Sequence, residues 1–141
     1  MKTLIALRGA GNRGKSRTLC MLIELIKVAY PSAKFEEKRY KIDITVVITV
    51  GTIKVGVETQ GDPNSRLERS LNTFVDIGCK VIVCASRSSG RTVEIVNEAG
   101  SRGYRVKWVE KASVQESAMQ CAANRASAGE LLTLVQAAID A

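Results

Sequence analysis

Eight residues near the start of the chain, Gly9 to Ser16, read Gly-Ala-Gly-Asn-Arg-Gly-Lys-Ser and match the pattern G-x-x-x-x-G-K-[ST]. Glycine permits the positive φ angles and the close backbone approach that a loop needs when its N–H groups surround a polyphosphate. An apolar run over 3–7 precedes the motif as a short strand, and a second run that stops at Tyr30 follows it as a helix. This order predicts that the first strand ends at an anion-binding site.

Within the motif, the side chains of two residues have distinct expected roles. Lys15 is expected to reach the β- and γ-phosphates, and the Ser16 hydroxyl is expected to bind Mg²⁺. The residues expected to bind the nucleotide here are Gly9, Gly11, Asn12, Arg13, Gly14, Lys15, Ser16 and Arg17. The alternative is a glycine-rich turn that carries Lys-Ser without binding phosphate.

On these residues the chain resembles the P-loop NTPase superfamily. A second segment, Glu58-Thr59-Gln60-Gly61, follows an apolar strand and is similar to the Asp-x-x-Gly strand end of Ras-like GTPases, with Glu in place of Asp. Glu58 is therefore expected to bind Mg²⁺ and the N–H of Gly61 to meet the γ-phosphate, and the resemblance implies that Asp62 orients the attacking water. Because no Asn-Lys-x-Asp motif follows a later strand, the expected base is adenine.

The two acidic residues each have a structural alternative. Asp62 precedes Pro63, a pair typical of a helix N-cap, although a capping box at Ser65 and Glu68 predicts a later helix start. Glu58 has the alternative of a surface residue at a strand end.

A serine- and glycine-rich segment, 86–92, follows the next apolar strand. Its Arg87 is expected to stabilise charge on the transferred phosphoryl group, and the alternative is a solvated arginine in a flexible loop. Asp43 and Asp76 are interpreted as surface residues.

Strand and helix signals alternate along the chain. They predict an α/β fold, specifically a three-layer P-loop NTPase fold in a single domain, 1–141, with a mostly parallel sheet and one antiparallel edge strand. The antiparallel strand comes from a hairpin over 42–58, after a polar connection through Lys41. Capping boxes at Ser113 and Ser127 predict a C-terminal pair of helices. The remaining expected elements are strands at 80–85 and 105–109 and helices at 15–29, 65–77 and 91–99.

Composition excludes several classes of site. The chain has no histidine and its four cysteines form no C-x-x-C pair, which argues against a zinc site and excludes histidine-dependent catalysis. The cysteines lie among apolar residues and are expected to be reduced core thiols. No apolar run is long enough to span a membrane and no signal-peptide pattern is present, so a cytoplasmic protein is expected.

The net charge of +7 favours an anionic partner, which is expected to be a nucleoside triphosphate. Nucleic acid is a possible partner, but the basic residues are scattered rather than interleaved with aromatic residues. We expect Mg²⁺-dependent ATP binding and hydrolysis, with 58–65 coupling the nucleotide state to a protein partner. The alternatives are a small-molecule or nucleotide kinase, and a non-enzymatic binding protein.

Overall fold

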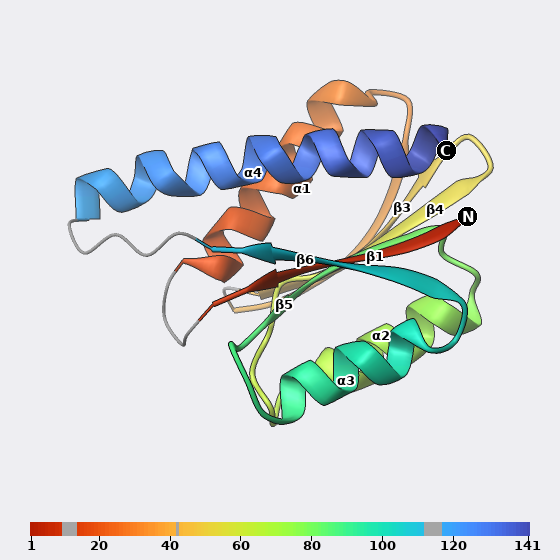
Figure 1. Ribbon diagram of the computed structural model, residues 1–141. Helices are drawn as coiled ribbons and strands as arrows, with labels where there is room; N and C mark the ends of the chain where they lie inside the picture. Colours follow the sequence, from red (N-terminus) through yellow and green to blue (C-terminus); the bar gives the residue numbers. More distant parts are fainter. Residues whose placement is uncertain (10–13, 42, 112–116) are drawn as a thin grey trace.

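Four helices cover both faces of one mixed sheet in the computed structural model, which describes residues 1–9, 14–41, 43–111 and 117–141 (Figure 1). The α/β class predicted from the sequence is therefore confirmed. The elements, in chain order, are β1 (Lys2–Arg8), α1 (Lys15–Ala29), β2 (Lys34–Tyr40), β3 (Asp43–Val50), β4 (Ile53–Glu58), α2 (Leu67–Asp76), β5 (Val81–Ser86), α3 (Arg91–Gly100), β6 (Tyr104–Glu110) and α4 (Ser117–Asp140).

The six strands lie in the order β2-β3-β4-β5-β1-β6. The strands β4, β5, β1 and β6 are parallel to one another, whereas β3 is antiparallel to both of its neighbours, β2 and β4. The single antiparallel edge strand expected from the sequence is thus replaced by two antiparallel pairings, because the predicted polar connection forms β2. That strand has mostly charged residues and an exposed outer edge, so its sequence lacks the apolar alternation of a half-buried strand.

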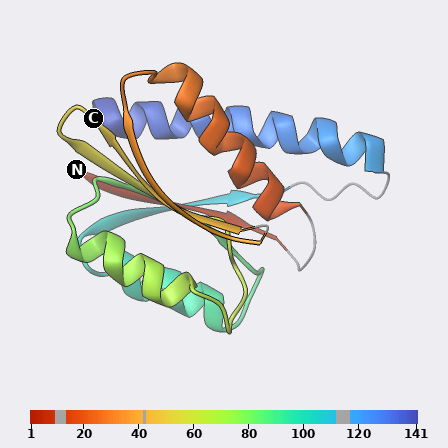
Figure 2. The same cartoon turned by 180° about the vertical axis from the view of Figure 1, so that it is seen from behind.

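The central strands are buried on both faces, and each face has its own core. On β1, Ile5 and Leu7 belong to the core beneath α1 and α4, while Leu4 and Ala6 belong to the core beneath α2 and α3. Figures 1 and 2 show these two helix pairs on opposite sides of the sheet. The near-continuous apolar run of β1 is the pattern expected of a parallel strand covered on both sides.

The C-terminal segment forms one helix, α4, so the predicted pair of helices is wrong. Ser127, expected to begin the second helix, is buried in the middle of α4, and Ser113 lies outside the described residues. Ala128, Leu131 and Val135 recur at helical spacing and are buried on one face. Continuous packing of this face against α1 outweighs the local capping signal.

No helix among the described residues is long and apolar enough to cross a membrane.

The four cysteines are free, but they differ in burial. Cys79 and Cys84 are buried, as expected from the sequence, whereas Cys121 is exposed on α4 and the expectation of a core thiol is wrong there. Desolvation raises the pKa of Cys79 to about 11 and that of Cys84 to about 12. A thiol needs to ionise before it reacts. These two thiols are therefore protected from reagents both by their burial and by their raised pKa values, which keep them protonated near neutral pH.

We predict that an alkylating reagent near neutral pH labels Cys121 in the folded protein, while Cys79 and Cys84 react only after denaturation. Mass spectrometry of the labelled peptides, with Cys121→Ser as the control, measures the order of reaction. Labelling of Cys84 at the rate of Cys121 in the folded protein would contradict the packing of β5 in the core.

Candidate functional site

The glycine-rich motif begins where β1 leaves the sheet between its two parallel neighbours. The N–H of Gly9 donates to the carbonyl of Ser86 at the end of β5 (3.1 Å), and the N–H of Lys111 donates to the carbonyl of Arg8 (2.7 Å). A Cβ added to Gly9 would lie 3.3 Å from Cβ of Lys111, so a larger residue fits poorly here. The exit of β1 is therefore fixed by the ends of β5 and β6.

The motif ends at the N-terminus of α1. Gly14 is the N-cap and has φ of 81°, in the left-handed region that favours glycine. Its carbonyl accepts hydrogen bonds from the backbone N–H and the hydroxyl of Thr18 (2.9 and 2.8 Å). The first turn, which includes Arg17, contains no acidic residue, and the helix dipole makes this end attractive to anions. The expected nucleotide-binding residues Gly11, Asn12 and Arg13 lie outside the described residues.

Lys15 lies folded back over the exit of β1. Its side chain is buried, and its ammonium donates a hydrogen bond to the carbonyl of Gly9 (2.6 Å). Burial lowers the pKa of Lys15, nearby Asp62 opposes that shift, and Arg87 adds to it. The structure therefore brings all three predicted catalytic residues within electrostatic range of one another.

Ser16 contacts an acidic residue that sequence analysis placed on the surface. Its hydroxyl lies 3.2 Å from Oδ1 of Asp43 and 3.0 Å from the carbonyl oxygen of Thr59, both of them acceptors. Asp43 also accepts hydrogen bonds from the hydroxyl of Thr59 (2.9 Å) and from the side-chain amide of Gln60 (3.0 Å). Asp43 is half-buried, so its surface interpretation was wrong.

The direction of β3 explains this position. Because β3 is antiparallel to β4, its first residue, Asp43, lies at the edge of the sheet where the parallel strands have their carboxyl ends. The predicted hairpin already indicated this position of Asp43, because the first residue of one hairpin strand lies beside the last residue of the other.

Glu58, the predicted metal ligand, has a different environment. Its side chain is fully buried and its Oε1 accepts hydrogen bonds from the hydroxyls of Thr45 and Ser70, each at 2.6 Å. Its Oε2 accepts from the N–H of Gln60 (3.0 Å) and from the guanidinium of Arg66 (3.4 Å). The carboxylate is therefore occupied by four donors of the protein.

The register of β4 sets the face on which Glu58 lies. Gly56, two residues earlier, lies against Phe74 of α2, and an added Cβ would be 2.5 Å from the ring. Since alternate residues of a strand share a face, Glu58 faces α2 rather than α1. In addition, β5 separates β4 from β1. The predicted metal ligation by Glu58 stays a prediction, and among the described residues Ser16 meets the carboxylate of Asp43 instead.

The segment after β4 brings the remaining predicted residues together. The guanidinium of Arg87 contacts Oδ1 of Asp62 through Nε (3.3 Å) and Nη2 (3.1 Å), and both side chains are largely exposed. The neighbouring Gly61 packs against Ala85 of β5, where an added Cβ would lie 2.6 Å from the alanine Cβ. Glycine is thus required for this crossing of β5, and the phosphate contact of Gly61 stays a prediction.

Asp62 does not cap α2 in this arrangement. The helix begins at Leu67, whose N–H donates to the hydroxyl of Ser65 (3.2 Å). The predicted capping box is incomplete, because the carboxylate of Glu68 pairs with Arg91 of α3 (2.9 Å). The carboxylate of Asp62 is consequently left at the loop, beside Arg87.

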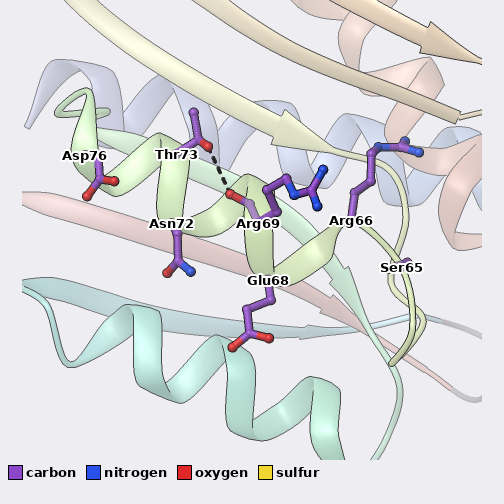
Figure 3. A pocket seen from close by; sticks show the side chains of 7 residues that line it. All are labelled: Ser65, Arg66, Glu68, Arg69, Asn72, Thr73 and Asp76. Atoms are coloured by element: carbon purple, nitrogen blue, oxygen red, sulfur yellow. Dashed lines mark hydrogen bonds between the residues drawn. The ribbon is translucent and has the colours of Figure 1, made fainter.

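Two surface hollows adjoin the start of α2. One, of about 660 Å³, is lined by 60, 62–66 and 87 and includes the Asp62–Arg87 pair. The other, of about 560 Å³, runs along α2 (Figure 3). In that view Glu68 and Asn72 extend toward α3, and they accept hydrogen bonds from Arg91 of α3 and from Arg102, which follows it. The second hollow is lined by α2 and by the two residues before it, Ser65 and Arg66, and not by Lys15 or Ser16.

Comparison of the chain with protein-family models, curated proteins and solved structures found no significant match. The glycine-rich motif and the contacts of Lys15, Ser16 and Asp43 are therefore the features that indicate a function.

We predict different effects for two isosteric substitutions, one on metal binding and one on stability. Asp43→Asn keeps an acceptor for Ser16 and Thr59 but removes the negative charge, so Mg²⁺ affinity or metal-dependent activity should fall about ten- to a hundredfold. Glu58→Gln loses an acceptor within a buried network, so the free energy of unfolding should fall by about 1–3 kcal/mol.

Calorimetric Mg²⁺ titration in the presence of nucleotide and urea denaturation of both variants separate these effects. Loss of the metal response in Glu58→Gln, with Asp43→Asn unaffected, would restore Glu58 as the metal ligand.

Proposed function

We propose that the protein is a small P-loop NTPase that binds ATP with Mg²⁺ and hydrolyses it. The observation that carries the proposal is the contact of Ser16 with Asp43 at the N-terminus of α1, beside the buried ammonium of Lys15. A hydroxyl, a carboxylate and a lysine at a helix N-terminus are the groups needed to hold a metal-bound polyphosphate.

The phosphates would be held by positive charge and by the backbone. Lys15 already donates to the carbonyl of Gly9, and a phosphate oxygen, which carries more negative charge, is the stronger acceptor. The N-terminus of α1 adds its dipole to this attraction. Its first turn has no acidic side chain that competes for the same site.

The oxygen atoms around Ser16 suit Mg²⁺, which prefers hard oxygen ligands. Ser16 would ligate the ion. Asp43 would accept a hydrogen bond from the hydroxyl of Ser16 and so orient that ligand. Thr59 and Gln60 hold the carboxylate of Asp43 in place through their own hydrogen bonds. When bound, Mg²⁺ neutralises charge on the β- and γ-phosphates.

Hydrolysis would use the Asp62–Arg87 pair. Arg87 is exposed enough to exchange its partner, and a γ-phosphate at Lys15 would compete with Asp62 for the guanidinium. Contact with Arg87 then stabilises the charge of the phosphoryl group. Asp62, released from the pair, is free to orient the attacking water.

The segment after Glu58 also connects the proposed metal site to α2, which supports a role in signalling to a protein partner. Gln60 donates through its amide to Asp43 (3.0 Å) and accepts from the N–H of Arg66 (3.2 Å). Arg66 in turn stacks on the ring of Tyr40, 3.5 Å from its centroid. A change at Asp43 therefore has a direct path to the first turn of α2 and to the edge strand.

Hydrolysis is favoured over the kinase alternative. A kinase usually needs an acceptor-binding lid, and the polar connection expected over 32–41 is largely the paired strand β2.

We predict that the protein binds ATP in the presence of Mg²⁺ and releases phosphate without an added acceptor. Lys15→Ala should weaken ATP binding about ten- to a hundredfold, because it removes a charge-assisted contact worth roughly 1.5–3 kcal/mol. Calorimetry and a phosphate-release assay measure both, with the exposed Lys107→Ala as the matched control. A folded Lys15→Ala protein with unchanged affinity would contradict the proposed function.

We further predict that Asp62→Asn lowers single-turnover hydrolysis by about a hundredfold while leaving the melting temperature nearly unchanged. The Asp62–Arg87 pair is exposed, and exposed ion pairs contribute little to stability. Arg87→Ala should also lower turnover, and the double variant should lose less than the product of the two single losses, because the residues act as a unit. Full activity of Asp62→Asn would leave the orientation of water to another group.

A further inference from the structure

Two polar residues, Asn124 and Ser127, lie among the buried residues of α4, and Asn124 interrupts the face by which this helix packs in the core. This face carries Ala128, Leu131 and Val135, and Asn124 occupies the equivalent position one turn before Ala128. Asn124 is only 2% exposed. Helical periodicity therefore places an amide where an apolar side chain is expected.

The amide of Asn124 is incompletely paired. Its Oδ1 is buried and has no hydrogen-bond donor among the residues that the structure describes. Burying such an acceptor without a donor is unfavourable, and most buried polar atoms in proteins have a partner. Leucine at this position would fill similar space without that cost, so packing alone does not account for asparagine.

The position of this amide relates it to the proposed ATP site. Asn124 lies against Gly14: an added Cβ on the glycine would be 2.7 Å from Oδ1 and 3.0 Å from Nδ2. Gly14 is the N-cap of α1 and the residue before Lys15. The unpaired oxygen is thus directed at the helix end that would hold the phosphates.

Asp43 and Asn124 approach this first turn from different sides. Ser16 meets Asp43 of β3, whereas Gly14 meets Asn124 of α4. Figures 1 and 2 show α4 packed alongside α1 on the same face of the sheet.

The chemistry of ATP then indicates which part of it reaches Asn124. In the proposed site Ser16 and Asp43 would hold the metal and the phosphates bound to it, whereas Asn124 lies on the flank of Gly14. Ionised phosphates have no hydrogen-bond donors, whereas the nucleoside has ribose hydroxyls and a base amino group. An unpaired acceptor on this flank suits the nucleoside and not the phosphates.

We propose that Asn124 is a specificity-determining residue that recognises the nucleoside part of the bound nucleotide, with its amide oxygen accepting a hydrogen bond from a ribose hydroxyl or from the exocyclic amino group of the base. The inference rests on the proposed ATP site and adds a contact that distinguishes a nucleotide from a bare polyphosphate.

The test compares ATP with inorganic tripolyphosphate, each with Mg²⁺, on the wild-type protein and on Asn124→Leu. The substitution should weaken ATP binding about three- to tenfold and leave tripolyphosphate binding unchanged, because only ATP supplies the donor. The melting temperature of the free variant should stay the same or rise, since leucine removes a buried unpaired acceptor. A residue with a purely structural role would not weaken ATP binding selectively.

Three analogues distinguish the possible donors: 2′-deoxy-ATP, 3′-deoxy-ATP and purine riboside triphosphate, which lacks the amino group. The analogue that lacks the relevant donor should bind the wild-type protein as weakly as ATP binds Asn124→Leu, and the variant should no longer distinguish it from ATP. Equal binding of ATP and all three analogues by the wild-type protein would overturn the inference without any variant.

Ser127→Ala, which changes another buried polar residue of α4, is the matched control and should affect neither ligand. Equal losses of ATP and tripolyphosphate binding in Asn124→Leu, or unchanged ATP binding, would overturn the assignment of Asn124 and leave the proposed function intact. Failure of the wild-type protein to bind either ligand would overturn both.

Discussion

The direction of β3 is the constraint on which the proposed site depends. A strand parallel to its neighbours would place its first residue at the opposite edge of the sheet, far from the end of β1. Because β3 runs the other way, Asp43 meets Ser16 at the N-terminus of α1. Thr59, which directly follows β4, accepts a hydrogen bond from Ser16 through its carbonyl and donates one to Asp43 through its hydroxyl. One hairpin thus supplies the oxygen atoms that surround the predicted metal ligand.

A second polar cluster, joined to the first by Gln60, lies at the same end of the hairpin and has a different consequence. The carboxylate of Glu58 is buried with donors from Thr45, Ser70, Gln60 and Arg66. A fully satisfied buried network of this kind specifies one arrangement of the elements that contribute to it. Here it fixes the start of α2 against the hairpin, so the network positions the segment through which Gln60 contacts Asp43.

Much of the fold was predictable because its signals are local. The strand before Gly9, the helix after Gly14 and the hairpin each follow from residues close in sequence, and all three are present. The sequence does not predict β2, because this strand is an exposed edge with charged residues. It predicts two helices in place of α4, because the capping signal at Ser127 is local and does not reflect the packing of the buried face. Both errors arise where tertiary contacts outweigh local preference.

The sequence by itself determined the glycine-rich motif, the order of most strands and helices, and the identity of Lys15 and Ser16 as the candidate ligands. Only the tertiary structure decided which carboxylate reaches Ser16, because Asp43 and Glu58 lie at the same end of one hairpin and the register directs Glu58 to α2. It also decided that Asn124 lies on Gly14. These contacts join residues far apart along the chain, and their distances depend on strand direction and helix packing, which no local pattern encodes.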